Sequence, residues 1–270
     1  MKSILVYANE DGGFDARLQT SLDLARAFDA HLTFLQVTPY DSFIMGDPFG
    51  GIYALPVVVE EIRKGEEAHR SKVEEKLLRE SISWNWENYE GAPAQVLLER
   101  ASLADLIVVS LAPPADERSD APLSLAADVA VHARSAVIAV PVDLKAFDCA
   151  GQAMVCWNGS PEGAHALRLA LPLLERASAV QVVTISDDAA GYPPTEACHY
   201  LARHDIHAQL HAWPLGEGST ADAIRSAAAT LGAAYLVMGC YGHSRLREAI
   251  LGGVTREMLR ESGLPLLIAH

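Results

Sequence analysis

The sequence lacks long apolar runs and basic tracts. Apolar stretches such as 104–112 and 136–142 fall short of the roughly 20 residues that span a bilayer. No segment is rich in Lys and Arg, and the formal net charge of −14 disfavours binding to a phosphate backbone. We therefore expect neither a membrane nor a nucleic acid among the partners.

Motifs for redox and metal chemistry are also missing. The four cysteines form no CxxC pair, so neither a zinc ribbon nor a thioredoxin-like site is indicated. His204, His207 and His211 lie close together, but an expected change from helix to strand turns them in different directions, so we expect no metal site. The first residues show no signal-peptide cleavage site, and we expect a cytoplasmic location.

Common catalytic and nucleotide-binding signatures are absent as well. The sequence has no GxSxG elbow and no HExxH motif, and no pair of acid and base residues has a spacing that forces a shared site. It has neither the GxxxxGK[ST] loop nor a GxGxxG after the opening strands. We therefore name no catalytic residue.

A long internal repeat is the main feature that is present. An apolar strand, a polar turn, a helix-period segment and a second apolar strand begin at Ile4 and again at Met154, with Asn9 and Asn158 in the same place. Later, LIVVS at 106–110 matches YLVMG at 235–239, and AVIAV at 136–140 matches PLLIA at 265–269.

The two copies differ in length by one segment. Asn9 and Asn158 are 149 positions apart, whereas the strands at Leu106 and Tyr235 are 129 apart, so the first copy holds about 20 additional residues. They correspond to 38–56, which is rich in Gly, Pro and aromatic residues and reads as an extended loop. Such a loop either covers a pocket or packs against the neighbouring domain.

The apolar pattern predicts an α/β fold. Strands of near-continuous Val, Ile, Leu and Ala alternate with helix-period segments, which indicates parallel sheets with helices on both faces. We predict two tandem, doubly wound, five-stranded domains, 1–145 and 151–270, with the boundary near 143–151. The strands expected in the second copy are 153–157, 180–185, 207–213, 235–238 and 264–269.

A glycine-rich segment follows the fourth strand of the second copy. The chain leaves the strand at Met238, passes Gly239 and Gly242, and meets Gly252 and Gly253 before a helix. Glycines let backbone amides approach an anion, and the helix start at 254–256 adds free N–H groups. Alternatively, the glycines only mark the end of a strand and the start of a helix.

This segment resembles the universal stress protein family. Its nucleotide-binding members carry Gly, two residues, Gly, nine residues, Gly and then Ser or Thr, and Gly239, Gly242 and Gly252 match that spacing. The likeness extends through 254–270 and more weakly to 157–170, so it covers the second copy and the framework of the first. It implies Rossmann-like domains of the adenine nucleotide alpha-hydrolase type.

The resemblance also implies a ligand. An adenine nucleotide, ATP or a relative with or without Mg²⁺, would lay its phosphates along the glycines and its base against the backbone at Ile185. His243 and Arg245 would screen phosphate charge, unless they are merely solvated. The expected binding residues are Asn158, Ile185, Met238, Gly239, Gly242, His243, Arg245, Gly252, Gly253, Val254 and Thr255.

Two departures from the family pattern bear on that ligand. Asn158 replaces the usual Asp and loses a charge that favours a divalent cation. Gly253 replaces Ser or Thr, so a hydroxyl expected near the phosphates is missing. Thr255 either supplies this hydroxyl or only supports the start of the helix. Both changes point to weaker binding or to AMP-like ligands.

The first copy has lost the glycines. Ser110, Pro113, Leu123 and Ser124 stand where the second copy has Gly239, Gly242, Gly252 and Gly253. Proline offers no amide donor and Leu123 obstructs close backbone approach, so we predict that the first copy binds no nucleotide in this manner.

The function implied is a nucleotide-binding module in stress response or signalling. The enzymatic alternative is slow ATP hydrolysis at the same loop. A third reading is a nucleotide-independent scaffold whose loop at 38–56 binds a hydrophobic ligand or a protein. The resemblance further implies an intramolecular pseudo-dimer through 136–140 and 264–269, and it leaves a homodimer of two chains open.

Overall fold

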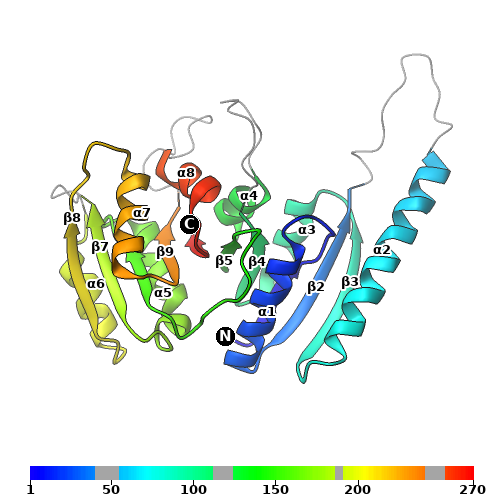
Figure 1. Cartoon of the computed structure of the whole chain (residues 1–270), viewed down its shortest axis with the longest axis horizontal. Helices are drawn as coiled ribbons and strands as arrows, with labels where there is room; N and C mark the ends of the chain where they lie inside the picture. Colours follow the sequence, from blue (N-terminus) through cyan, green and yellow to red (C-terminus); the bar gives the residue numbers. More distant parts are fainter. Residues whose placement is uncertain (40–54, 112–123, 186–190, 241–252) are drawn as a thin grey trace, which may run out of the picture.

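The computed structural model describes residues 1–39, 55–111, 124–185, 191–240 and 253–270. Within these residues ten strands form one sheet, and helices cover both of its faces (Figure 1). Five of the described strands come from each half of the chain, so the predicted class of two tandem five-stranded parallel α/β units is confirmed.

The N-terminal half alternates strands and helices as the apolar periodicity predicts. Its elements are β1 (Ser3–Tyr7), α1 (Phe14–Phe28), β2 (His31–Thr38), α2 (Leu55–Leu77), β3 (Ser83–Glu90), α3 (Pro93–Arg100), the short 3-10 helix η2 (Ala101–Leu103), β4 (Leu106–Ser110), α4 (Leu125–His132) and β5 (Ala136–Val140).

The C-terminal half repeats this order. Its elements are β6 (Ala153–Cys156), α5 (Pro161–Leu174), β7 (Val180–Ile185), α6 (Pro194–Ala202), β8 (Ala208–Trp213), α7 (Thr220–Leu231), β9 (Tyr235–Gly239), α8 (Gly253–Glu261) and β10 (Leu266–Ala269).

Two strands begin later than the sequence pattern predicts. The strand expected over 207–213 begins at Ala208, because Asp205 adopts a left-handed φ of 59° in the turn after α6. The strand expected over 264–269 begins at Leu266, because Gly263 turns the chain with a φ of 66° and Pro265 has no N–H to donate.

The order of the strands is symmetric about the centre of the sheet. It runs β3-β2-β1-β4-β5-β10-β9-β6-β7-β8, so each half repeats the same order outward. Neighbours are parallel except β5 and β10, which pair antiparallel with Ile138 opposite Leu267. Both central strands are buried. The two last strands of the repeat are therefore neighbours in one continuous sheet.

Two apolar clusters lie on the two faces of the sheet, and each extends through both halves. Helices α1, α2, α5 and α6 contribute to the first core cluster, and α3, α4, α7 and α8 contribute to the second core cluster. The connection between the halves is packed as well, since Phe147 donates its N–H to the Asp23 carboxylate at 2.9 Å and its ring lies 5.5 Å from that of Tyr235.

The histidine cluster is divided between elements. α6 ends before His204 and β8 begins after His207, while His211 bonds to Gln181 of β7 at 2.6 Å. Across the described part of the chain, no three His, Cys, Asp or Glu side chains are grouped to hold a metal. The helices described there include none long and apolar enough to cross a membrane.

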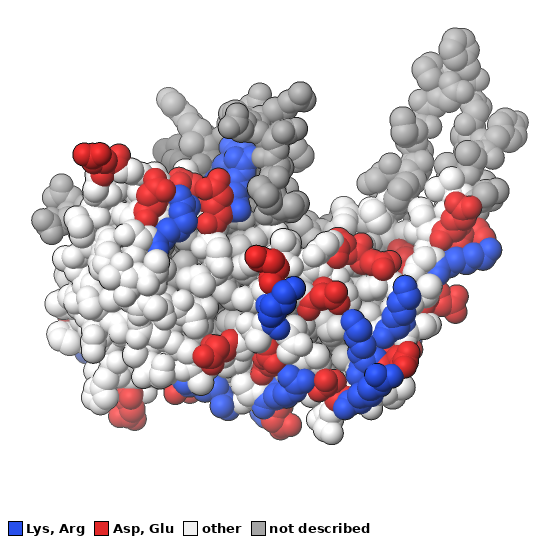
Figure 2. Space-filling view, viewed as in Figure 1, with Lys and Arg blue, Asp and Glu red and all other residues white. Residues whose placement is uncertain are grey.

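The surface carries charges of both signs. On the face shown in Figure 2, Lys and Arg alternate with Asp and Glu, most densely over the N-terminal half. The described residues of this face therefore create a mixed field. Most of the loop expected over 38–56 lies outside the described residues, and so does its interpretation as a lid or a packing element.

Candidate functional site

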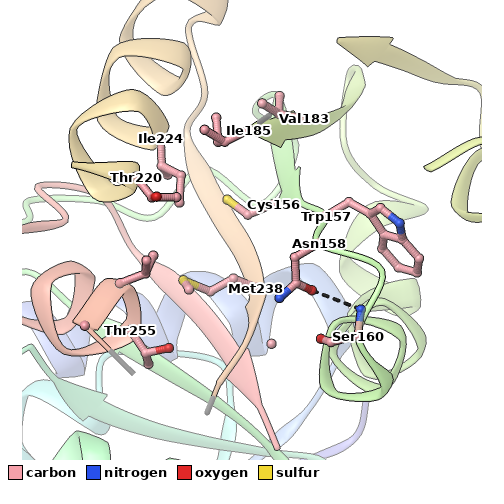
Figure 3. A pocket seen from close by; sticks show the side chains of 13 residues that line it. Cys156, Trp157, Asn158, Ser160, Val183, Ile185, Thr220, Ile224, Met238 and Thr255 are labelled. Atoms are coloured by element: carbon pink, nitrogen blue, oxygen red, sulfur yellow. Dashed lines mark hydrogen bonds between the residues drawn. The ribbon is translucent and has the colours of Figure 1, made fainter. Parts of the chain in front are cut away.

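A cavity of about 240 Å³ opens at the carboxyl ends of β6, β7 and β9 (Figure 3). In open α/β sheets this edge is where ligands usually bind. The volume is just below the roughly 300–1,000 Å³ usual for small-molecule sites. The cavity is lined by Cys156, Trp157, Asn158, Ser160, Val183, Ile185, Thr220, Ile224, Met238, Gly239, Gly253, Val254 and Thr255.

One wall of the cavity is apolar. Val183 and Ile185 come from β7, Ile224 from α7 and Met238 from β9, and in Figure 3 their side chains surround Cys156. Val183 and Ile224 are both members of the second core cluster, and Ile185 packs against it. This shared packing brings the β7 and α7 side chains to the same wall. Such a wall suits the flat face of a heterocycle.

The other wall is formed by the N-termini of three helices. Ser160 is the N-cap of α5 and its hydroxyl accepts from the N–H of Gly163 at 3.0 Å. Thr220 opens α7, and Gly253, Val254 and Thr255 open α8. Helix N-termini carry partial positive charge and free N–H groups. Their convergence gives this end of the cavity a partial positive charge, which is favourable for an anion.

A polar network joins α7 to α8 behind the cavity. Ser219 and Asp222 form a capping box at the start of α7, and Arg225 donates to Asp222 at 2.6 Å and to Glu257 of α8 at 2.9 Å. Hydrogen bonds from the Ser219 N–H and then from Arg225 lower the pKa of Asp222. Partial burial opposes the charge on Arg225, but its bonds to Glu257 and Asp222 prevail and raise its pKa.

Asn158 is oriented by its own turn. Its Oδ1 accepts from the N–H of Ser160 at 3.1 Å, which Figure 3 marks. Trp157 donates its N–H to the Val183 carbonyl at 2.8 Å. Because polar backbone groups alternate in direction along a parallel strand, the N–H and C=O of Ile185 face the same side as those of Val183. The backbone at Ile185 therefore faces the side on which Asn158 lies.

Gly239 has a packing role that the sequence reading did not assign. A Cβ at this position would lie 2.4 Å from the Gly163 nitrogen and 2.5 Å from the Glu162 carbonyl carbon. The end of β9 therefore touches the start of α5 directly, and only glycine permits that approach. At Gly253, by contrast, an added Cβ meets none of the described atoms within 4 Å.

The thiol in the cavity is a packing group rather than a nucleophile. Burial raises the pKa of Cys156 to about 12, so the thiol stays protonated at neutral pH.

Seven of the eleven expected binding residues lie around this one cavity. They are Asn158, Ile185, Met238, Gly239, Gly253, Val254 and Thr255. The other four, Gly242, His243, Arg245 and Gly252, lie outside the described residues. The sequence analysis missed the other lining residues, which are Cys156, Trp157, Ser160, Val183, Thr220 and Ile224. For Ser160 and Thr220 a signal existed, because Ser before Pro161 and the Ser219–Asp222 pair are N-cap patterns.

A profile of the universal stress protein family matches residues 151–270, the whole C-terminal half. This half belongs to the universal stress protein family. No curated protein matches the sequence.

Solved structures extend the likeness to the whole chain. A universal stress protein from Archaeoglobus fulgidus DSM 4304 has a TM-score of 0.76 at 15% identity and covers 98% of this chain and 97% of its own. A putative universal stress protein from Pseudomonas aeruginosa UCBPP-PA14 has a TM-score of 0.62 at 15% identity and covers 100% and 93%. The N-terminal half thus shares the universal stress fold.

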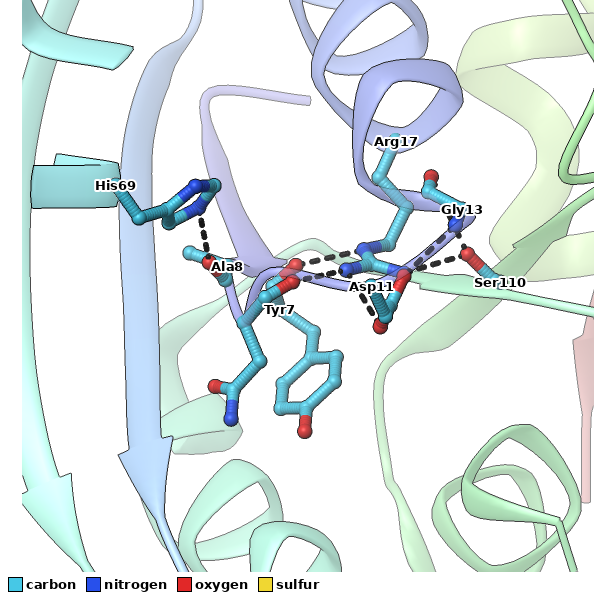
Figure 4. A network of polar contacts seen from close by, with 8 residues as sticks. Tyr7, Ala8, Asp11, Gly13, Arg17, His69 and Ser110 are labelled. Atoms are coloured by element: carbon cyan, nitrogen blue, oxygen red, sulfur yellow. Dashed lines mark hydrogen bonds and ion pairs between the residues drawn. The ribbon is translucent and has the colours of Figure 1, made fainter. Parts of the chain in front are cut away.

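In the N-terminal half, the matching strand ends carry a network of charged and polar groups (Figure 4). Arg17 of α1 is 1% exposed and donates to the carbonyl of Tyr7 at 2.7 Å and to Ser110 Oγ at 2.6 Å. It also pairs with Asp11 at 2.9 Å. Ser124 caps α4 by accepting from the Ala127 N–H. Pro113 and Leu123 lie outside the described residues.

Proposed function

We propose that the C-terminal half binds an adenine nucleotide and that the chain is a nucleotide-responsive module of the stress response. The observation that carries this proposal is the cavity in which an apolar wall faces the N-termini of α5, α7 and α8. A nucleotide has the same division, since its base is flat and largely apolar and its phosphates are anionic. Family membership of residues 151–270 adds independent support.

The arrangement suggests where each part of the ligand lies. The base would lie against Ile185 and Ile224, within reach of the β7 backbone, and the phosphates at the start of α8. Thr255, which is 5% exposed, supplies a hydroxyl there in place of the one that Gly253 lacks. The glycines at 242 and 252 would complete the anion site.

Binding is favoured over hydrolysis by the groups that are present. Among the described residues that line the cavity, the polar side chains are neutral, namely Asn158, Ser160, Thr220 and Thr255. Neutral hydroxyls and an amide hold a ligand by hydrogen bonds, whereas ATP hydrolysis needs a metal, an oriented water and charge stabilisation. Slow ATP hydrolysis remains the alternative activity, and product formation during the titration below would reveal it.

We also propose that the halves, 1–145 and 151–270, act as an intramolecular pseudo-dimer. The antiparallel pairing of β5 with β10 supports this interpretation. A cytoplasmic location remains a prediction from the N-terminal sequence, and the association of two chains remains open.

The test of nucleotide binding is a calorimetric titration of nucleotide-free protein with ATP, ADP and AMP, with and without Mg²⁺. The matched variants are Val254→Glu and Val254→Gln, which have nearly the same shape and differ by one charge at the start of α8. We expect one site per chain in the wild type and in Val254→Gln, and strongly weakened ATP binding in Val254→Glu because its carboxylate repels phosphate.

The titration tests both the binding of a nucleotide and the position of its phosphates. No saturable binding by the wild type would overturn the nucleotide proposal and favour the scaffold. Equal ATP binding by both variants would show that the phosphates lie away from α8. Both variants should keep the wild-type unfolding temperature, since Val254 is partly exposed and an acidic side chain is favourable at a helix N-terminus.

A further inference from the structure

Each half contains an equivalent backbone hydrogen bond at the end of its first strand, and this pair of bonds aligns the two halves residue by residue. Ala8 donates its N–H to the Leu35 carbonyl at 2.8 Å, and Trp157 donates to the Val183 carbonyl at 2.8 Å. The registers agree, because Tyr7 pairs with Leu35 as Cys156 pairs with Val183. Tyr7 therefore occupies the position of Cys156, Asn9 that of Asn158, and Val37 that of Ile185.

The backbone N–H and C=O of Val37 are both hydrogen-bonded to the side chain of Asn9. Asn9 donates from Nδ2 to the Val37 carbonyl at 2.7 Å, and its Oδ1 accepts from the Val37 N–H at 2.8 Å. The amide thus offers the paired donor and acceptor that a planar base would offer. In the C-terminal half, Asn158 bonds to Ser160 instead, which leaves the equivalent side of Ile185 to the cavity.

Tyr7 and Cys156 differ greatly in size at the same position. The Tyr7 ring packs against the second core cluster, and Figure 4 shows it pointing away from α1. Burial raises the pKa of Tyr7 to about 12, so its phenol is neutral. Cys156 packs against the same cluster and lines the cavity. A large ring in one half therefore stands at the position of a small, cavity-lining thiol in the other.

Arg17 adds a buried charged side chain to the strand ends of the N-terminal half. The offset of 149 positions that aligns Asn9 with Asn158 also aligns Arg17 with Ala166, so these two residues hold equivalent positions on α1 and α5. The Arg17 guanidinium donates to the Asn9 carbonyl at 2.8 Å in addition to its bonds to Tyr7 and Ser110. Ala166 is buried and has no polar group to place there.

We propose that the side chain at the end of the first strand of each half decides which half takes a ligand. Tyr7, with Asn9 and Arg17, closes the N-terminal site from within. Cys156 keeps the C-terminal cavity open and is its specificity-determining residue. This inference rests on the proposed nucleotide site and adds that exclusion from the N-terminal half acts at the base end of the site, not only at the lost glycines.

The test is a graded series at position 156, Cys156→Ser, Cys156→Val, Cys156→Leu and Cys156→Tyr, titrated with ATP and with adenosine. We expect Cys156→Ser to bind like the wild type, affinity to fall as the side chain grows, and Cys156→Tyr to lose saturable binding of both ligands. Stoichiometry should be one ligand per chain. Loss of adenosine binding identifies the base end, because adenosine has no phosphate.

Thermal unfolding and circular dichroism identify variants that are folded. If Cys156→Tyr unfolds, the Val and Leu variants still decide the question through their graded affinity. A folded Tyr or Leu variant that binds as tightly as Cys156→Ser would overturn the inference, and so would two sites per chain in the wild type. Absence of binding by the wild type would instead overturn the proposed function, so the two failures are distinguishable.

Discussion

Gly239 and Gly253 flank the same segment of the C-terminal half, but their surroundings differ. The end of β9 rests on the backbone of Glu162 and Gly163, whereas a Cβ added at Gly253 meets none of the described atoms within 4 Å. In the N-terminal half the equivalent contact joins Gly13 at the start of the helix to Ser110 at the end of the strand. A glycine at this contact in each half therefore meets a packing need that is independent of any ligand.

This difference predicts opposite effects of alanine at the two glycines. Gly239→Ala forces the end of β9 away from the start of α5 and is expected to lower the free energy of unfolding by about 3 kcal/mol. Gly253→Ala places alanine at the start of α8 without a clash with described atoms and is expected to change the free energy of unfolding by less than about 1 kcal/mol. Urea denaturation of both variants measures these free energies. Equal effects would show that β9 can move away from α5 at little cost.

At the scale of elements, the position of α8 depends on its contact with α7. Arg225 reaches from α7 to Glu257, and Asp222 both caps α7 and accepts from Arg225. The two helix starts that line the cavity are thereby held together. The matching helix of the other half, α3, begins after Ala92 with no side-chain cap. The network thus belongs to the half with the cavity.

The lowered pKa of Asp222 predicts how this network responds to pH. Because the folded pKa lies below the unfolded value near 3.9, the carboxylate stabilises the fold above that value, and the stabilisation is lost as pH falls through the folded pKa. Asp222→Asn should therefore lower the unfolding temperature at pH 7, and this difference from the wild type should shrink as pH falls below the unfolded value. Glu217→Gln, in the preceding loop, is the control. A difference that stays constant as the protein is acidified would contradict the assignment.

At the scale of the whole molecule, the central pair of strands unites the halves. β5 and β10 are buried, and each apolar cluster crosses from one half to the other. A half on its own would expose the edge of its last strand, and exposed apolar edges recruit another strand. The continuous sheet is therefore a property of the full chain.

Residues 151–270 expressed alone are expected to form a homodimer through β10, replacing β5 with a second copy of β10. Light scattering coupled to size-exclusion chromatography measures the mass, and Ile268→Lys, which places a charge in the pair opposite Val137, should abolish the dimer. A stable monomer of residues 151–270 would show that β10 tolerates an open edge.

The sequence by itself determined the repeat, the alternation of strands and helices and the tandem α/β class, because apolar periodicity is local and records burial directly. It also indicated Asn158, Ile185 and the residues around 253–255, since motif spacing along the chain reaches them. Only the tertiary structure decided that Gly239 packs on α5, that Thr220 and Ile224 join the cavity, and that Asn9 bonds to Val37. These contacts join segments distant in sequence, and their existence depends on register and close packing, which no local pattern encodes.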